Sequence, residues 1–207
     1  LEQIPVAQSA LMSIEAETGL EHGMVGGRDY NQTQFNRAIQ SRRQPGSAFK
    51  PIIYAAALDK QFDDPEKNYT PATVIVDSAI VFKDEERDFT WKPKNYKETF
   101  FGPTLFRKAL TKSRIQVTIK ILQDIGIDYA IDYATRLGID SKLSRDLSIA
   151  LGSSGISLLE LLRAYSVFAN RGYLVEPVFV LKVTDRNGKV LEEMATERKK
   201  VIEKSTA

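Results

Sequence analysis

Ser47 and Lys50 are the two residues of this sequence whose types and spacing most directly suggest chemistry. They follow the turn residues 44–46 (Gln-Pro-Gly) and lead into the apolar, alanine-rich run 52–58, so both are predicted to lie on the first turn of a helix. Residues i and i+3 share one helix face, which lets Ser47 Oγ and Lys50 Nζ meet. A serine hydroxyl becomes a good nucleophile when a base takes its proton, and a lysine in a dry cleft can be that base. The pair predicts nucleophilic catalysis, with Ser47 as nucleophile and Lys50 as base.

The spacing alone carries little weight. The chain has 14 serines and 16 lysines among its 207 residues, so about one Ser-x-x-Lys is expected by chance. A serine–histidine mechanism has a single candidate base, His22, which falls in a strand-like run without partner ligands at metal spacing. His22 is therefore predicted to be structural, and the serine chemistry is expected to be lysine-assisted.

The composition excludes several classes of function. The chain is long enough for one sizeable core or most of a larger domain. Its net charge of +2 leaves no electrostatic footprint for nucleic acid, so no nucleic-acid partner is expected. The absence of cysteine rules out disulfides and thiolate zinc sites, and no metal or other cofactor is expected. No apolar run has the length of a bilayer span, so membrane attachment is expected only through an anchor outside this chain.

Turn and periodicity signals predict the elements that must position Ser47 and Lys50. Strands are predicted in a hairpin over 9–28, in β-prone pieces at 73–76 and 80–82, and in a hairpin of 175–183 with 189–193 around Asn187-Gly188. Helices are predicted over 105–112 capped by Thr104, from 117 onward, over 128–138, over 143–150, and over 158–169 capped by Ser157. The glycines of 23–27 lack the spacing and the following helix of a phosphate-binding loop.

Three ordered blocks carry a resemblance to a known family. Residues 42–51 (RRQPGSAFKP) resemble, almost letter for letter, the nucleophile segment of class A (bifunctional) penicillin-binding proteins. Residues 91–96 (WKPKNY) and the stretch 151–172, which ends in FANRG, resemble later blocks of the same transpeptidase domain. Ser113-Arg114-Ile115 stands at the position of the family's second motif, Ser-x-Asn; Ser113 matches it and Ile115 does not.

The resemblance implies a fold and a chain organisation. The implied class is α/β (α+β), a penicillin-binding protein/β-lactamase-like transpeptidase fold with an antiparallel sheet flanked by helices. Residues 1–207 are expected to form a single transpeptidase domain with its C-terminal part missing, because no Lys-Thr-Gly motif follows. The glycosyltransferase domain that the family carries is not expected within these residues. Exposed strand edges then predict low solubility or dimerisation.

The resemblance also implies roles and partners. Ser47 would attack the carbonyl between two D-alanines of a peptidoglycan stem peptide, with Lys50 as base and Ser113 relaying protons. Ile115 replaces the asparagine that would bind Lys50 and the substrate's carbonyl, a loss worth about 1–3 kcal/mol. The implied partners are stem peptides, β-lactam antibiotics and cell-wall synthesis proteins. The implied location is the bacterial cell envelope, at the periplasmic face of the inner membrane.

Two alternatives remain open. Ile115 and the missing Lys-Thr-Gly are compatible with a catalytically dead scaffold or cell-wall binding module of the same fold. A related penicilloyl serine transferase could instead act as a β-lactamase or sensor, but the Glu-x-x-x-Asn pattern of a deacylating base is not found in the sequence. Acylation of Ser47 separates the transpeptidase from the scaffold.

Overall fold

The computed structural model describes residues 3, 5–84, 89–93 and 99–207. Their contacts divide the chain into two compact units. The first unit comprises Leu1–Arg43, Ala134–Ser141 and Gly155–Ala207, and the second comprises Gln44–Tyr133 and Lys142–Ser154. The predicted residues Ser47, Lys50, Ser113 and Ile115 all lie in the second unit.

In the first unit, the N-terminal hairpin confirms the sequence prediction. Strand β1 (Leu11–Ile14) pairs antiparallel with β2 (Glu21–Val25). Helix α5 (Leu158–Ala169) packs against β1 and begins at the predicted cap. The Ser157 hydroxyl accepts from the Glu160 N–H while the Glu160 carboxylate accepts from the Ser157 N–H, a complete capping box.

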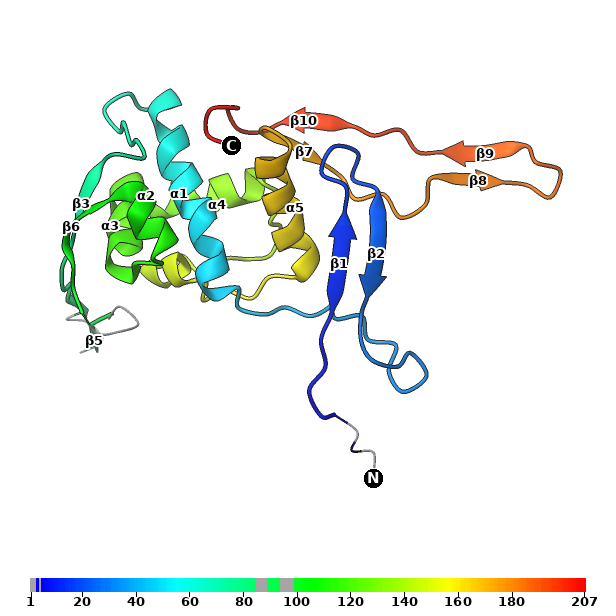
Figure 1. The fold of residues 1–207 in the computed structure, drawn as a ribbon, viewed down its shortest axis with the longest axis horizontal. Coiled ribbons are helices and arrows are strands. Elements are labelled where there is room, and N and C mark those ends of the chain that lie inside the picture. The colour runs from blue at the N-terminus through cyan, green and yellow to red at the C-terminus, as the bar shows by residue number, and fades with distance from the viewer. Residues whose placement is uncertain (1–2, 4, 85–88, 94–98) are drawn as a thin grey trace. The chain divides into compact units, whose positions relative to one another are not determined.

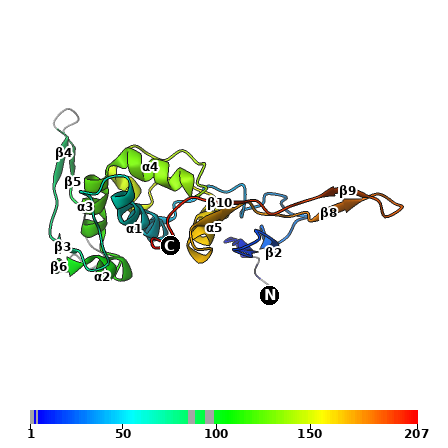
Figure 2. The ribbon, with the colours of Figure 1, turned by 90° about the horizontal axis from the view of Figure 1, so that it is seen from above.

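The C-terminal strands of the same unit differ in part from the prediction. The Asn-Gly turn joins β8 (Lys182–Thr184) to β9 (Val190–Glu193), as predicted. The expected continuous strand 175–183 is wrong, because β7 (Tyr173–Val175) ends before β8 and pairs instead with β10 (Arg198–Lys200). The basic strand β10 is held by contacts remote in sequence, since the Arg198 guanidinium lies over the Tyr173 ring. Figures 1 and 2 show the β8–β9 hairpin extending away from β1–β2.

The second unit is a helical cluster edged by short strands (Figure 1). A 3-10 turn, η1 (Gly46–Phe49), leads directly into α1 (Lys50–Asp59), which confirms the helix predicted around Ser47 and Lys50. Helix α1 packs on α3 (Ile115–Ile125) through side chains with no exposed surface. The remaining helical elements are η2 (Lys60–Phe62), α2 (Phe106–Thr111), α4 (Ile127–Arg136), which continues into the first unit, and η3 (Leu147–Leu151).

The strands of the second unit form antiparallel ladders. Strand β3 (Val74–Asp77) pairs with β6 (Gly102–Leu105), and β4 (Phe82–Asp84) pairs with β5 (Phe89–Trp91). Trp91 stacks on Phe82 with ring centroids 5.3 Å apart, as an anchor of this ladder. The rest of the predicted block from position 94 to 96 lies outside the described residues. The mixed helix and strand fold with antiparallel pairing confirms the expected class; in the described residues the strands pair in twos.

Two local predictions in this unit are wrong. Thr104 does not cap a helix; it lies on β6 opposite Ile75, its hydroxyl donates to the Gly102 carbonyl, and α2 starts two residues later. The backbone pairing of residues 102–105 with β3 outweighs the helix start that Gly-Pro-Thr predicts at residues 102–104. The helix predicted over 143–150 is only the turn η3, capped by Asp146. The amphipathic helix predicted over 128–138 is confirmed as α4, with Gly138 following it at φ +92°.

Candidate active site

Ser47 lies at the second position of η1 with its side chain exposed. The preceding Gly46 adopts φ +58° and its N–H donates to the Gly152 carbonyl at 3.2 Å. A Cβ atom on Gly152 would lie 2.3 Å from the Gly46 carbonyl oxygen, so only glycine fits there. Gly152 therefore supports the turn that presents Ser47. The sequence shows residues 151–155 only as part of the block 151–172, and the contact of Gly152 with Gly46 is not visible in it, because the two residues lie far apart along the chain.

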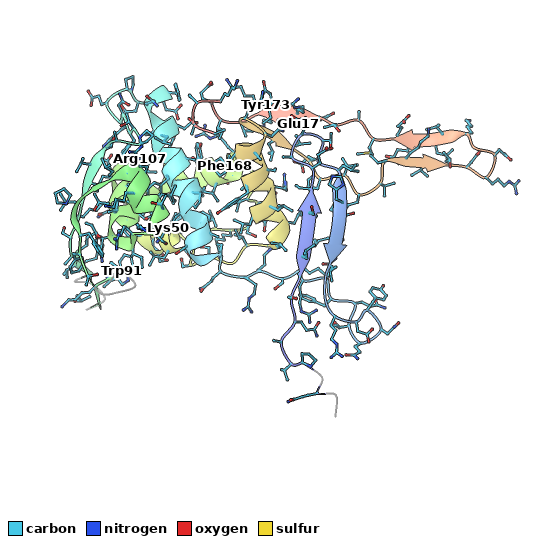
Figure 3. All side chains as sticks on the ribbon, in the orientation of Figure 1. Glu17, Lys50, Trp91, Arg107, Phe168 and Tyr173 are labelled. Atoms are coloured by element: carbon cyan, nitrogen blue, oxygen red, sulfur yellow. The ribbon has the colours of Figure 1, made fainter. Side chains whose placement is uncertain are left out.

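Lys50 is the first residue of α1 and is buried, with 1% of its surface exposed (Figure 3). Its Nζ donates two hydrogen bonds to Ser113, one to the backbone carbonyl and one to Oγ, both at 2.8 Å. Burial disfavours the ammonium and lowers the pKa of Lys50 from 10.5 to about 8. Roughly a tenth of the Lys50 side chains are then neutral at pH 7, enough for the residue to act as a base.

Ser113 is held in the turn between α2 and α3 in a left-handed conformation, φ +52°. The Ser113 N–H donates to the Leu110 carbonyl and the Arg114 N–H to the Ala109 carbonyl, both at 2.9 Å. This pair of bonds is a Schellman motif, whose left-handed position is normally occupied by glycine. The backbone thus turns the Ser113 hydroxyl toward η1, where it donates to Ser47 Oγ at 3.0 Å.

The structure brings Ser47, Ser113 and Lys50 together in one hydrogen-bonded chain. The hydroxyl of Ser113 stands between Ser47 Oγ and Lys50 Nζ, 3.0 and 2.8 Å away. Such a chain can carry a proton from one serine hydroxyl to a neutral lysine amine by way of the other hydroxyl.

The other singled-out residues do not join this chain. Ile115 is the first residue of α3, half-buried, and its side chain offers no donor or acceptor. His22 lies exposed on β2 in the first unit. In the described part of the chain, no group of three or more His, Cys, Asp or Glu side chains is placed to hold a metal ion. None of the described helices combines the length and the apolar character needed to cross a bilayer.

Comparison with known proteins identifies relatives of this chain. The model of the penicillin-binding protein transpeptidase domain matches residues 10–207. The chain is 45% identical to penicillin-binding protein 1A of Pseudomonas aeruginosa over 206 residues, 99% of this chain and 24% of that protein. The crystal structure of penicillin-binding protein 1A from Haemophilus influenzae superposes with a TM-score of 0.86 at 38% identity, over 96% of this chain and 29% of that one.

A more distant structure supports the fold alone. PonA1 of Mycobacterium tuberculosis, solved in complex with penicillin V, has a TM-score of 0.80 at 23% identity, over 98% of this chain and 54% of that one. The chain spans about a quarter of the length of the Pseudomonas relative. The family model covers nearly the whole chain, and its match confirms the resemblance predicted from residues 42–51, 91–96 and 151–172. The chain belongs to the penicillin-binding protein transpeptidase domain family.

Proposed function

We propose that this chain carries the acyl-transfer site of a serine D,D-transpeptidase that cross-links peptidoglycan. The observation that carries the proposal is the hydrogen-bonded chain from Lys50 Nζ through Ser113 Oγ to Ser47 Oγ, together with the pKa of Lys50 lowered to about 8. Ser47 is the nucleophile, Lys50 the general base, and Ser113 the proton relay.

The reaction is an acyl transfer in two steps. Ser47 Oγ bonds to the carbonyl carbon between two D-alanines, while its proton passes to Ser113 Oγ and the Ser113 proton passes to neutral Lys50. The peptide C–N bond then breaks, and the leaving amine of the terminal D-alanine takes a proton back along the same chain. An amine of a neighbouring stem peptide next loses a proton to Lys50, attacks the ester carbonyl, and releases Ser47 with its hydroxyl restored.

β-Lactams are proposed as inhibitors that follow the first step only. Opening of the lactam ring leaves the leaving nitrogen tethered to the acyl group, where it blocks the acceptor amine. The penicillin V complex of PonA1 supports this assignment by likeness of fold. Stem peptides and cell-wall synthesis proteins are the proposed partners, at the periplasmic face of the inner membrane in the bacterial envelope. That residues 1–207 belong to one transpeptidase domain stays a prediction.

A second candidate function is a non-catalytic scaffold or cell-wall binding module of the same fold. Ile115 favours it, because an apolar side chain beside Ser113 cannot bind the substrate carbonyl. The two candidates make opposite predictions for the reactivity of Ser47.

Intact-mass spectrometry after incubation with excess benzylpenicillin tests the proposal. We expect one penicilloyl adduct on the native chain and on Ser205→Ala, which removes an exposed serine far along the sequence, and none on Ser47→Ala or Lys50→Met. Absence of the adduct from the native chain at every pH from 6 to 10 would favour the scaffold. An adduct that forms and is then hydrolysed within minutes would identify a β-lactamase.

A further inference from the structure

Arg114, the residue between Ser113 and Ile115, is held on two sides. Its Nε lies 3.9 Å from Asp77 Oδ2, an ion pair, and its guanidinium carbon lies 3.3 Å from the centre of the Phe101 ring. The Asp77 side chain has no exposed surface and that of Arg114 is 16% exposed. A planar guanidinium stacked on a ring beside a buried carboxylate has little freedom to move.

Asp77 and Phe101 come from the same end of one strand ladder. Asp77 is the last residue of β3 and pairs with Gly102, the first residue of β6. Phe101 comes directly before Gly102 in the sequence. The same end of β3 has a second connection to α3, because Lys120 Nζ donates to the Val76 carbonyl at 2.7 Å and to Ser78 Oγ at 2.8 Å. The residue before α3 and the middle of α3 are thus each tied to the same end of β3.

We propose that Asp77, Arg114 and Phe101 form a clamp that positions Ser113 between Ser47 and Lys50. The inference rests on the function proposed for Ser47. A serine at φ +52° has a backbone conformation that residues other than glycine avoid, so the turn needs support from its surroundings. The next residue supplies it, because the Arg114 N–H closes the Schellman turn and the Arg114 side chain anchors that turn to β3 and β6.

The clamp predicts a specific defect when it is opened. Without it, the Ser113 carbonyl and hydroxyl leave Lys50 Nζ, water reaches the ammonium, and the proton relay to Ser47 is broken. Arg114→Lys keeps the charge but loses the flat guanidinium that lies over the Phe101 ring. Asp77→Asn alone leaves a guanidinium without its counter-charge, so the double variant Asp77→Asn/Arg114→Gln is the cleaner test, since no unpaired charge stays buried.

The experiment measures two quantities on the native chain, on these variants, on Phe101→Leu, and on Arg107→Lys as control. Arg107 is an exposed arginine of the neighbouring helix α2 (Figure 3). The first quantity is the rate constant of Ser47 acylation by benzylpenicillin from pH 6 to 10. The second is the titration midpoint of Lys50, followed by NMR of ¹³Cε-labelled lysine and assigned with Lys50→Arg, which reports on the clamp whether or not Ser47 reacts.

In the clamp variants we expect acylation to fall by about 10- to 100-fold, and the Lys50 midpoint to rise from near 8 toward 10.5. The control keeps both native values. A role in stability alone would reduce the folded fraction but leave the Lys50 midpoint of the folded protein near 8. An unchanged midpoint in folded Asp77→Asn/Arg114→Gln overturns the clamp. Failure of the native chain to acylate, with a shifted midpoint in the variants, overturns the proposed function and leaves the clamp standing.

Discussion

Ser113 combines a hydroxyl that is hydrogen-bonded to both Ser47 and Lys50 with a backbone conformation that serine seldom adopts. Its position, C-terminal to α2 in a left-handed turn, is one that a helix normally fills with glycine. A glycine there would relax the backbone but would lack the hydroxyl that joins Ser47 to Lys50. The local conflict between backbone preference and side-chain identity is itself a sign of a functional position.

Substitution of Ser113 by glycine and by alanine separates the two effects. Neither variant has the hydroxyl, so we expect both to lose Ser47 acylation. Because only alanine keeps a Cβ in the left-handed conformation, Ser113→Gly should be more stable than Ser113→Ala by about 1 kcal/mol. Urea unfolding monitored by circular dichroism measures the difference. Equal stabilities would mean that φ +52° carries no strain in this turn.

Ile115 is expected to limit the reactivity of the site. Ile115→Asn introduces an amide where the side chain is now apolar, beside the Lys50 and Ser113 hydrogen bonds. One added polar contact of about 1–3 kcal/mol should raise the acylation rate by about 10- to 100-fold. Ile115→Leu, which stays apolar, should leave the rate within about twofold. Equal rates for the Asn and Leu variants would remove Ile115 from the substrate-binding site.

At the scale of elements, the turn η1 depends on the close approach of η3. Gly152→Ala combines a left-handed φ of +64° with a Cβ placed 2.3 Å from the Gly46 carbonyl oxygen. Gly126→Ala is its matched control, because Gly126 has φ +91° and open space around the added Cβ. Both should lose about 1 kcal/mol from backbone strain. Only Gly152→Ala should also displace η1 and slow the acylation of Ser47. The measurement is the rate constant of acylation by benzylpenicillin. Equal rate constants in the two variants would show that Gly152 does not support the site.

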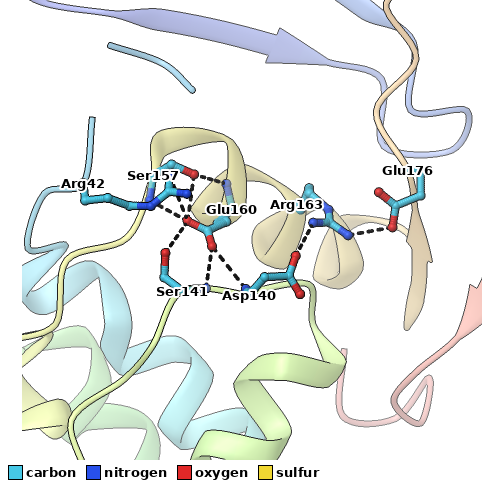
Figure 4. A network of polar contacts seen from close by, with 7 residues as sticks. All are labelled: Arg42, Asp140, Ser141, Ser157, Glu160, Arg163 and Glu176. Carbon is cyan, nitrogen blue, oxygen red and sulfur yellow. Dashed lines mark hydrogen bonds and ion pairs between the residues drawn. The ribbon is translucent and has the colours of Figure 1, made fainter. Parts of the chain in front are cut away.

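Glu160 organises the start of α5 in the first unit (Figure 4). Its carboxylate accepts hydrogen bonds from Ser157, Ser141 and the Asp140 N–H, and lies 3.6 Å from Arg42. Burial would raise the pKa of Glu160, but the hydrogen bonds from Ser157 and Ser141 outweigh burial and hold its pKa below 4.5.

Glu160→Gln should therefore destabilise the chain by about 2–3 kcal/mol at pH 7. Since the folded pKa lies below the unfolded one, this contribution is complete above pH 4.5 and is lost as the pH falls through the folded pKa. Glu176→Gln is the control in the same network, because the Glu176 side chain is 68% exposed where it meets Arg163; its loss should stay below about 1 kcal/mol. Urea unfolding over a series of pH values from 7 down to 2 tests both, and a Glu160→Gln effect that does not shrink as the pH falls below 4.5 would contradict the assignment.

Elements with local signals were predictable from the sequence. The β1–β2 hairpin, the Asn-Gly turn of β8–β9, and the Ser157 cap of α5 each follow from a few adjacent residues. Strand β10 and the strand position of Thr104 were not, because both arise from pairing with strands distant in sequence. For the site, the motifs predicted that Ser47, Lys50 and Ser113 act together. The left-handed turn at Ser113 could not be predicted, because residues 112–114 contain no glycine to indicate it.

At the scale of the whole molecule, exposed apolar side chains concentrate near one hairpin of the first unit. Phe179, Val180, Leu181, Leu191 and Met194 are each 47–61% exposed, on and next to β8–β9. Contiguous exposed apolar surface favours association with other chains. Val74 and Val76, on β3 of the second unit, are exposed apolar residues outside this hairpin. The sequence predicts association through exposed strand edges, and this apolar surface is a second candidate site for it.

We expect the purified chain to self-associate at micromolar concentrations, and the double variant Phe179→Thr/Leu181→Thr to remain monomeric at about tenfold higher concentration, because two large apolar side chains leave the exposed patch. Val74→Thr, a replacement of one exposed apolar residue outside the patch, should behave like the native chain. Sedimentation velocity over a concentration series measures the difference. If the native chain and the double variant sediment as monomers alike, the β8–β9 surface is not an association site; if both associate alike, another surface drives association.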